Sequence, residues 1–181
     1  MRFTPARLDG AYLVELERHD DARGYFARTF CARDFAEHGL EPAVAQSSVS
    51  YNYARGTLRG MHYQSPPGVE TKLVRCTRGA IYDVIVDLRP ESPTYLEHYG
   101  VELTAEDGVA LYVPPLLAHG FQTLEDATEV SYQISEFFVP EAARGIRWDD
   151  PALGIEWPLP VSVVSEKDRT WPAFRPLTVS H

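Results

Sequence analysis

The stretch Ile81-Tyr82-Asp83-Val84-Ile85-Val86-Asp87-Leu88 is rich in β-branched residues and is the clearest strand signal in the chain. Leu73–Cys76 precedes it across a turn at Gly79 and has the same composition. Many short strands separated by turn residues, without alternating helices, predict an antiparallel sandwich or barrel. Further strand-like segments follow at regular intervals: Gly100–Leu103, Ala110–Val113, Gly120–Leu124 and Glu129–Ile134.

Fourteen prolines and twelve glycines interrupt the chain so often that few segments could form a helix of ordinary length. The one clear helix signal is Ala32–His38, with Gly39 as its stop. After Pro158 the chain is irregular and rich in proline, which predicts a tail, 158–181, packed over the barrel. We therefore expect one domain, 1–181, that is mainly β with short peripheral helices.

Composition restricts the class of protein. A length of 181 residues, with 44 % apolar and 24 % charged, is typical of a folded domain that needs no disulfide or metal for stability. The net charge of −9 argues against a nucleic-acid partner. There is no apolar run of the roughly 20 residues that a membrane span needs, nor a signal peptide at Met1, so we expect a cytoplasmic protein without a membrane partner. Cys31 and Cys76 show neither metal nor redox spacing and are expected to be buried thiols in strand-like surroundings.

Polar residues inside predicted strands are candidates for a functional site, because an unpartnered buried charge costs several kcal/mol. Asp83 alternates with Ile81 and Ile85, so its carboxylate is buried if that face is the interior. Asp87 shares the face, which leaves a solvent-exposed face as an open alternative.

Two histidines raise the question of a metal site. His62 lies close to Gly60 in a strand-like segment, and His119 lies at a predicted junction between a loop and a strand. A metal-binding barrel would normally supply a second histidine beside the first and a carboxylate soon after, but Tyr63 and Gln64 follow His62. We therefore predict no metal.

Basic residues form two clusters in this acidic chain. Such a cluster can hold an anionic ligand such as a phosphate, although solvated surface arginines are the alternative. The clusters are Arg23, Arg28 and Arg33, and Arg55, Arg59, Lys72, Arg75 and Arg78.

Seven motifs together make the chain resemble the dTDP-4-dehydrorhamnose 3,5-epimerases over nearly its whole length. This resemblance implies a cupin jelly-roll (double-stranded β-helix) barrel, a homodimer that exchanges N-terminal strands, no metal or other cofactor, and a nucleotide-linked 4-keto-6-deoxyhexose as substrate. The motifs are Arg23-Gly24-Tyr25-Phe26, Leu58-Arg59-Gly60-Met61-His62-Tyr63-Gln64, Lys72-Leu73-Val74-Arg75, Asp83-Val84-Ile85-Val86-Asp87-Leu88-Arg89, His119-Gly120-Phe121, Trp148-Asp149-Asp150-Pro151 and Ser165-Glu166-Lys167-Asp168.

Epimerisation beside a C4 ketone needs a base on one face, a stabiliser for the enolate oxygen and an acid on the other face. The resemblance implies that His62 is the base and that Asp168 is its carboxylate partner. It implies that Tyr132 is the acid, on an inward strand face, and that Lys72 is the cation beside the enolate. No redox cofactor is needed for this chemistry.

The resemblance also implies a substrate-binding set. Phe138 would stack on the nucleotide base, Gln46 would contact that base, and Arg23 would reach the nucleotide across a dimer. Asp83 would orient either His119 or the catalytic histidine, His62, from behind. The whole set is Arg23, Phe26, Gln46, Ser48, Arg59, His119, Phe138 and Lys167.

Strand geometry puts one condition on this site. Arg59 and His62 would point to opposite faces of a straight strand, so a common ligand requires a bulge near Gly60 or a position of Arg59 at the rim.

The chain also departs from the family pattern at several positions. Relatives usually carry tyrosine at Phe138, commonly glutamate at Ala143 and Arg28, and Asp-Asn at Ser47-Ser48. These departures leave open the nucleotide base and whether C3, C5 or both are inverted. The alternatives are a nucleotide-sugar-binding cupin without catalysis, and a 3-epimerase or ketoisomerase acting on a different nucleotide sugar. A metal-dependent cupin oxygenase or isomerase is disfavoured by the missing ligands.

Overall fold

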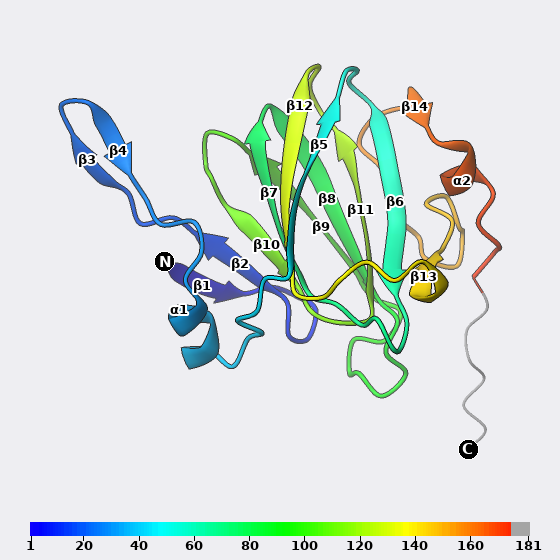
Figure 1. Ribbon diagram of the computed structural model, residues 1–181. Coiled ribbons are helices and arrows are strands. Elements are labelled where there is room, and N and C mark those ends of the chain that lie inside the picture. The colour runs from blue at the N-terminus through cyan, green and yellow to red at the C-terminus, as the bar shows by residue number, and fades with distance from the viewer. Residues whose placement is uncertain (175–181) are drawn as a thin grey trace.

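A computed structural model describes residues 1–174 (Figure 1). Most of the ordered structure is β, and the helices are short and lie at the periphery. The strands are β1 (Arg2–Pro5), β2 (Tyr12–Glu15), β3 (His19–Asp21), β4 (Gly24–Phe26), β5 (Gln46–Asn52), β6 (Thr57–Gln64), β7 (Lys72–Arg78), β8 (Ala80–Asp87), β9 (His98–Thr104), β10 (Ala110–Val113), β11 (Leu117–Thr123), β12 (Thr128–Ile134), β13 (Ala143–Gly145) and β14 (Val163–Val164). The helices are α1 (Ala32–Glu37), α2 (Glu166–Arg169) and a 3-10 turn at Pro140–Ala142.

Two sheets face each other and form the barrel. One has the order β1-β2-β10-β7-β12-β5, and the other has the order β13-β6-β11-β8-β9, with β14 added in parallel to β6. The interior is closed by apolar side chains from both sheets, among them Val74, Ile81, Phe121 and Val130, all almost fully buried. This is the predicted cupin jelly roll.

The strand predicted at 81–88 is β8, and the turn before it is made by Gly79 with a φ of +76°. Asp83 and Asp87 are both completely buried, so the solvent-exposed alternative for this face is wrong. The opposite face of β8 is covered too, because Val84 and Val86 pack against the segment that follows β13. A strand buried on both faces explains why its apolar run has few interruptions.

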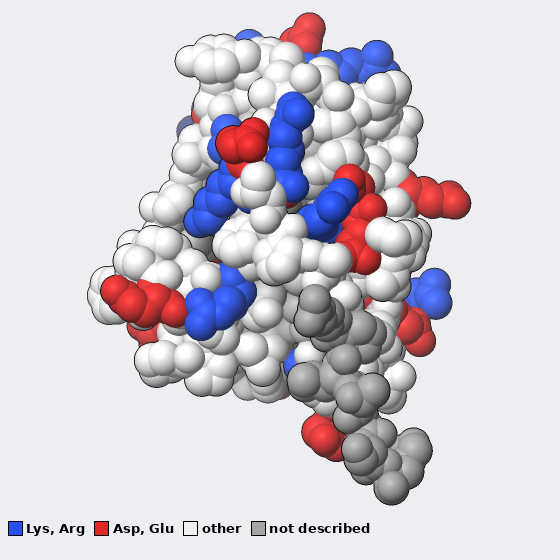
Figure 2. Space-filling model, turned by 90° about the vertical axis from the view of Figure 1, so that its right-hand side faces the viewer, with Lys and Arg blue, Asp and Glu red and all other residues white. Residues whose placement is uncertain are grey.

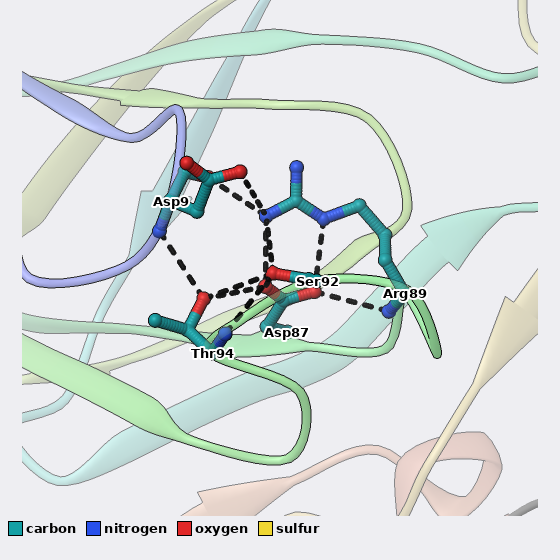
Figure 3. A network of polar contacts seen from close by, with 5 residues as sticks. All are labelled: Asp9, Asp87, Arg89, Ser92 and Thr94. Atoms are coloured by element: carbon teal, nitrogen blue, oxygen red, sulfur yellow. Dashed lines mark hydrogen bonds and ion pairs between the residues drawn. The ribbon is translucent and has the colours of Figure 1, made fainter.

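Asp87 is held by a dense polar network (Figure 3). Its carboxylate accepts bonds from Arg89 (2.7 and 2.9 Å), Ser92 (2.5 Å) and Thr94 (2.7 Å). Arg89 also donates to the carbonyl oxygen of Asp9 at 2.7 Å, which ties the 89–94 loop to the N-terminal segment. Burial opposes ionisation of Asp87, but these bonds outweigh it and lower its pKa to about 2.

This network predicts an acid-sensitive part of the stability. Because the pKa of Asp87 lies below its ordinary value of 3.8, the stabilisation is complete above about pH 4 and is lost as the pH falls toward 2. The full amount is about 2 kcal/mol, of which roughly half is gone at pH 3. Urea unfolding at pH 6 and pH 3 should show a smaller loss in Asp87→Asn than in the wild type. Equal losses in the two proteins would contradict this role.

The helix predicted at Ala32–His38 is α1, which ends one residue earlier, with Gly39 at a φ of +70° behind it. Because α1 begins at residue 32, Cys31 lies at its N-terminus and is only partly buried, so the expected strand burial is wrong for it. Cys76 is buried in β7 as predicted, and both thiols are free.

At the C-terminal end, β14 pairs with β6, and Gln122 bonds the carbonyl oxygen of Leu159 at 2.8 Å, so 158–174 run along the barrel. The remainder of the expected tail, 175–181, lies outside the described residues.

At the N-terminal end, β1 pairs with β2 and β2 with β10 of the same chain, while the β3–β4 hairpin extends away from the barrel (Figure 1). No helix within 1–174 is both long and apolar enough to cross a membrane.

Candidate active site

A cavity lies between the two sheets. Its volume of about 650 Å³ is in the range of small-molecule binding sites. The exposed side chains of Arg144 and Lys167 line it from β13 and α2. Figure 2 views this side of the molecule, where Lys and Arg side chains gather near the middle beside acidic ones. The cavity lining includes ten of the predicted site residues: Gln46, Ser48, Arg59, His62, Lys72, His119, Tyr132, Phe138, Lys167 and Asp168.

His62 and Asp168 form a dyad across the cavity wall. His62 Nε2 on β6 lies 2.6 Å from Asp168 Oδ1 on α2, and the imidazole side chain is 45 % exposed. Burial opposes ionisation of Asp168, but the hydrogen bond and charge of His62, together with the bonds from the Gly60 backbone N–H and the Ser165 side chain, keep the pKa of Asp168 below its ordinary value. If Nε2 donates to this carboxylate, Nδ1 of the neutral ring is free to accept a proton. The dyad therefore has the properties of a general base.

Helix α2 positions Asp168 next to His62. The sequence analysis named Asp168 as the partner of His62 but did not predict this helix. Ser165 caps the helix, and its Oγ accepts a bond from the backbone N–H of Asp168 at 3.1 Å. Ser-x-x-Asp is a capping-box spacing, so this signal was available in the sequence.

A second dyad consists of His119 and Asp83. His119 Nε2 lies 2.7 Å from Asp83 Oδ1, so Asp83 orients His119 and not His62. His119 lies inside β11, directly opposite His62 on β6, and its predicted place at a loop junction is wrong. The loop prediction failed because Leu117 and Ala118 already belong to the strand and are buried.

Of the two ways for Arg59 and His62 to reach one ligand, the structure shows the bulge near Gly60. His119 pairs with His62, but Phe121 pairs with Arg59, so β6 carries one extra residue at this point. Gly60 has a φ of +138°, and a Cβ there would lie 2.6 Å from the Cα of Gly120. Only glycine fits this close approach. Arg59 and His62 therefore both line the cavity.

Tyr132 lines the cavity from β12, in the sheet opposite His62. Its ring makes an edge contact with His119 at a centroid distance of 6.2 Å. Burial, together with the negative charge of Asp83, raises the pKa of Tyr132 well above its ordinary value. The phenol therefore keeps its proton at neutral pH.

Lys72 lines the cavity at the start of β7 and forms an ion pair that sequence reasoning missed. Its Nζ lies 2.6 Å from Glu70 Oε1, and both side chains are almost fully buried. The spacing of two residues, which places both side chains on one face of an extended segment, could have indicated the pair.

Phe138 is 59 % exposed and lies at the cavity wall. Two glutamine side chains bond the backbone of Phe138 and of the residue after it. Gln46 Oε1 accepts a bond from the N–H of Phe138 at 2.7 Å, and Gln64 Oε1 accepts one from Val139 at 2.8 Å. Trp171 also lines the cavity and was not predicted.

Some predicted residues are not brought to the cavity. Arg23 lies on the β3–β4 hairpin and pairs with Asp21 at 2.5 Å, and Phe26 is 71 % exposed at the end of the same hairpin. Of the larger basic cluster, only Arg59 and Lys72 line the cavity, because neighbouring residues of a strand alternate between its faces. Arg75 points outward, where it bonds the carbonyl oxygen of Thr29.

Within residues 1–174 no three His, Cys, Asp or Glu side chains are grouped so that they could hold a metal ion. A histidine with a buried carboxylate partner, an opposed tyrosine and a cation between two sheets define a cupin-type site for proton transfer.

The family model described as dTDP-4-dehydrorhamnose 3,5-epimerase matches residues 5–176. A protein of that name from Methanothermobacter thermautotrophicus is 46 % identical over 179 residues, which cover 96 % of this chain and 95 % of the relative. The chain therefore belongs to the dTDP-4-dehydrorhamnose 3,5-epimerase family, whose namesake activity is an isomerisation.

Solved structures of similar epimerases support this family assignment. The dTDP-4-dehydrorhamnose 3,5-epimerase from Bacillus anthracis, with TDP and PPi bound, has a TM-score of 0.92 and 37 % identity, covering 96 % of this chain and 99 % of that one. ChmJ from Streptomyces bikiniensis, a 3'-monoepimerase in complex with dTDP-quinovose, has a TM-score of 0.86 and 35 % identity, covering 93 % and 86 %.

Proposed function

We propose that this protein epimerises a dTDP-linked 4-keto-6-deoxyhexose, as the names of its relatives indicate, by removing and returning protons next to the ketone. The observation that carries the proposal is the placement of His62 and Tyr132 on opposite sheets of one cavity. A base and an acid on opposite sides of a planar enolate are what inversion requires. Lys72 would stabilise the enolate oxygen, and neither a metal nor a redox cofactor takes part.

The proposal is tested by incubating the protein with dTDP-4-keto-6-deoxyglucose in deuterium oxide. NMR and mass spectrometry should show deuterium at C3, C5 or both, with inverted product. Binding of the nucleotide sugar without exchange would support the alternative of a non-catalytic binding cupin. Exchange and inversion at C3 alone would favour the 3-epimerase alternative, for which ChmJ provides a precedent among the relatives.

Lys72→Ala should reduce kcat by roughly 10²–10³-fold while KM changes much less. A cation beside the enolate interacts more strongly with the transition state than with the neutral ketone, so its loss mainly slows turnover. Steady-state kinetics separate the two effects. A rise in KM alone would show instead that Lys72 anchors the diphosphate.

The proposal includes a homodimer in which the hairpin of one chain completes the site of the other. Arg23 and Phe26 lie far from their own cavity on a hairpin that extends away from the barrel (Figure 1). Light scattering should therefore give about twice the chain mass of 20.4 kDa, and Arg23→Ala should weaken nucleotide-sugar binding. A monomer that binds the nucleotide sugar with full affinity would contradict the dimer.

A cytoplasmic location, where both free thiols stay reduced, also belongs to the proposal.

A further inference from the structure

Glu70 faces the cavity beside Lys72, and both of its carboxylate oxygens are engaged. Oε1 pairs with Lys72 Nζ at 2.6 Å, and Oε2 accepts a bond from Gln64 Nε2 at 2.7 Å. Only 9 % of the Glu70 side chain and 11 % of the Lys72 side chain are exposed. A pair this buried keeps one geometry, unlike the mobile ion pairs of protein surfaces.

Gln64 fixes Glu70 from the other side. The side chain of this glutamine, at the end of β6, is buried, and its Nε2 also donates to the carbonyl oxygen of Gly68 at 2.8 Å. The carbonyl oxygen of Phe137 lies 3.3 Å from the same nitrogen and shares one of its two hydrogens. Gln64 Oε1 accepts the bond from Val139. One amide therefore connects Glu70 to both backbone neighbours of Phe138, and the carboxylate cannot move without breaking this network.

Charge alone does not explain a carboxylate at this place. Glu70 is negative, so it opposes the negative charge that develops on an enolate and weakens the field of the Lys72 ammonium. What the carboxylate supplies is a fixed partner for the ammonium group of a long side chain with many rotamers. This effect acts through Lys72.

We propose that Glu70 is a positioning residue that holds the Lys72 ammonium toward the reacting carbonyl, with Gln64 locking Glu70 in place. The inference rests on the proposed epimerase function and on the role of Lys72 in it. Misplacement of a catalytic group by about 1 Å can cost up to a hundredfold in rate. We therefore expect Glu70 to contribute to turnover and little to binding of the substrate.

The test is a double-mutant cycle of Glu70→Gln and Lys72→Met, with kcat, KM and deuterium exchange measured for each protein. Glu70→Gln is expected to lower kcat by about ten- to a hundredfold with KM within about threefold of the wild type. In the Lys72→Met background the same change should cause no further loss, because the group it positions is gone. Glu102→Gln, at an exposed position of β9, is the matched control and should leave the rate unchanged.

Glu70→Asp separates position from charge, because it keeps the carboxylate but retracts it by one methylene. It should also lose turnover while its melting temperature and dTDP affinity stay near those of the wild type. Wild-type rates in Glu70→Gln or Glu70→Asp, a faster Glu70→Gln enzyme, or equal losses in both Lys72 backgrounds would each overturn the inference. An inactive wild type would overturn the proposed function together with it, which is a distinguishable result.

Discussion

Replacing His62 by alanine is expected to abolish both deuterium exchange and inversion at the carbons next to the ketone. Exchange requires only that a base remove the proton and return one from solvent, and inversion requires this step as well. General bases typically contribute about 10²–10⁴-fold, so both rates should fall by that factor together. The measurement is proton NMR of the nucleotide sugar in deuterium oxide over a long time course.

Two further variants make the His62 result specific. His62→Asn keeps a polar group that can still bond Asp168, whose Oδ1 lies 2.6 Å from the native imidazole, and it should be as inactive as alanine. His98→Ala, on β9 and outside the cavity lining, should retain full activity. Substantial exchange in both His62 variants would show that another group is the base.

Tyr132→Phe is expected to separate the two observables, leaving exchange within a fewfold of the wild type while inversion falls by about 10²–10⁴-fold. His62 can remove a proton and, after its own proton has exchanged with solvent, return a deuteron on the same face. Inversion needs a donor on the far face, and the tyrosine lines the same cavity from the sheet opposite His62. Comparing the rate of deuterium incorporation with the rate of product formation makes the distinction.

A matched control for this variant is Tyr53→Phe, at a tyrosine that is 86 % exposed and outside the cavity lining. It should affect neither rate. Equal residual exchange and inversion in His62→Ala and Tyr132→Phe would disprove the assignment of the two residues to opposite faces of the enolate.

Strand positions could be predicted from the sequence because they depend on local patterns. The run at 81–88 and the turn at Gly79 match β8 and its preceding glycine almost residue for residue. Alternation also placed Asp83 on the same face as Ile81, which is the interior of the barrel. The family resemblance added the identities of His62 and Tyr132, whose roles stay predictions until the variants are measured.

Local patterns were insufficient where a residue depends on contacts distant in sequence. The face that Asp83 and Asp87 share could not be assigned to the interior from alternation alone, because an antiparallel strand can leave one face in water. Whether Asp83 orients His62 or His119 likewise depended on the register between β8 and β11.

The sequence by itself determined the central strands and the mainly β class, because side-chain alternation and turn preferences act over a few residues, and the family resemblance supplied the site residues. The strands β1 to β5, β13 and β14 were not predicted. Only the tertiary structure decided that Asp83 pairs with His119 and that Gln64 joins Glu70 to the Phe138 segment. The pairing of Asp168 with His62 across 106 residues had been implied by the family resemblance alone. The reason is physical. Such contacts are set by sheet register and by how two sheets pack, and neither is encoded in a local pattern.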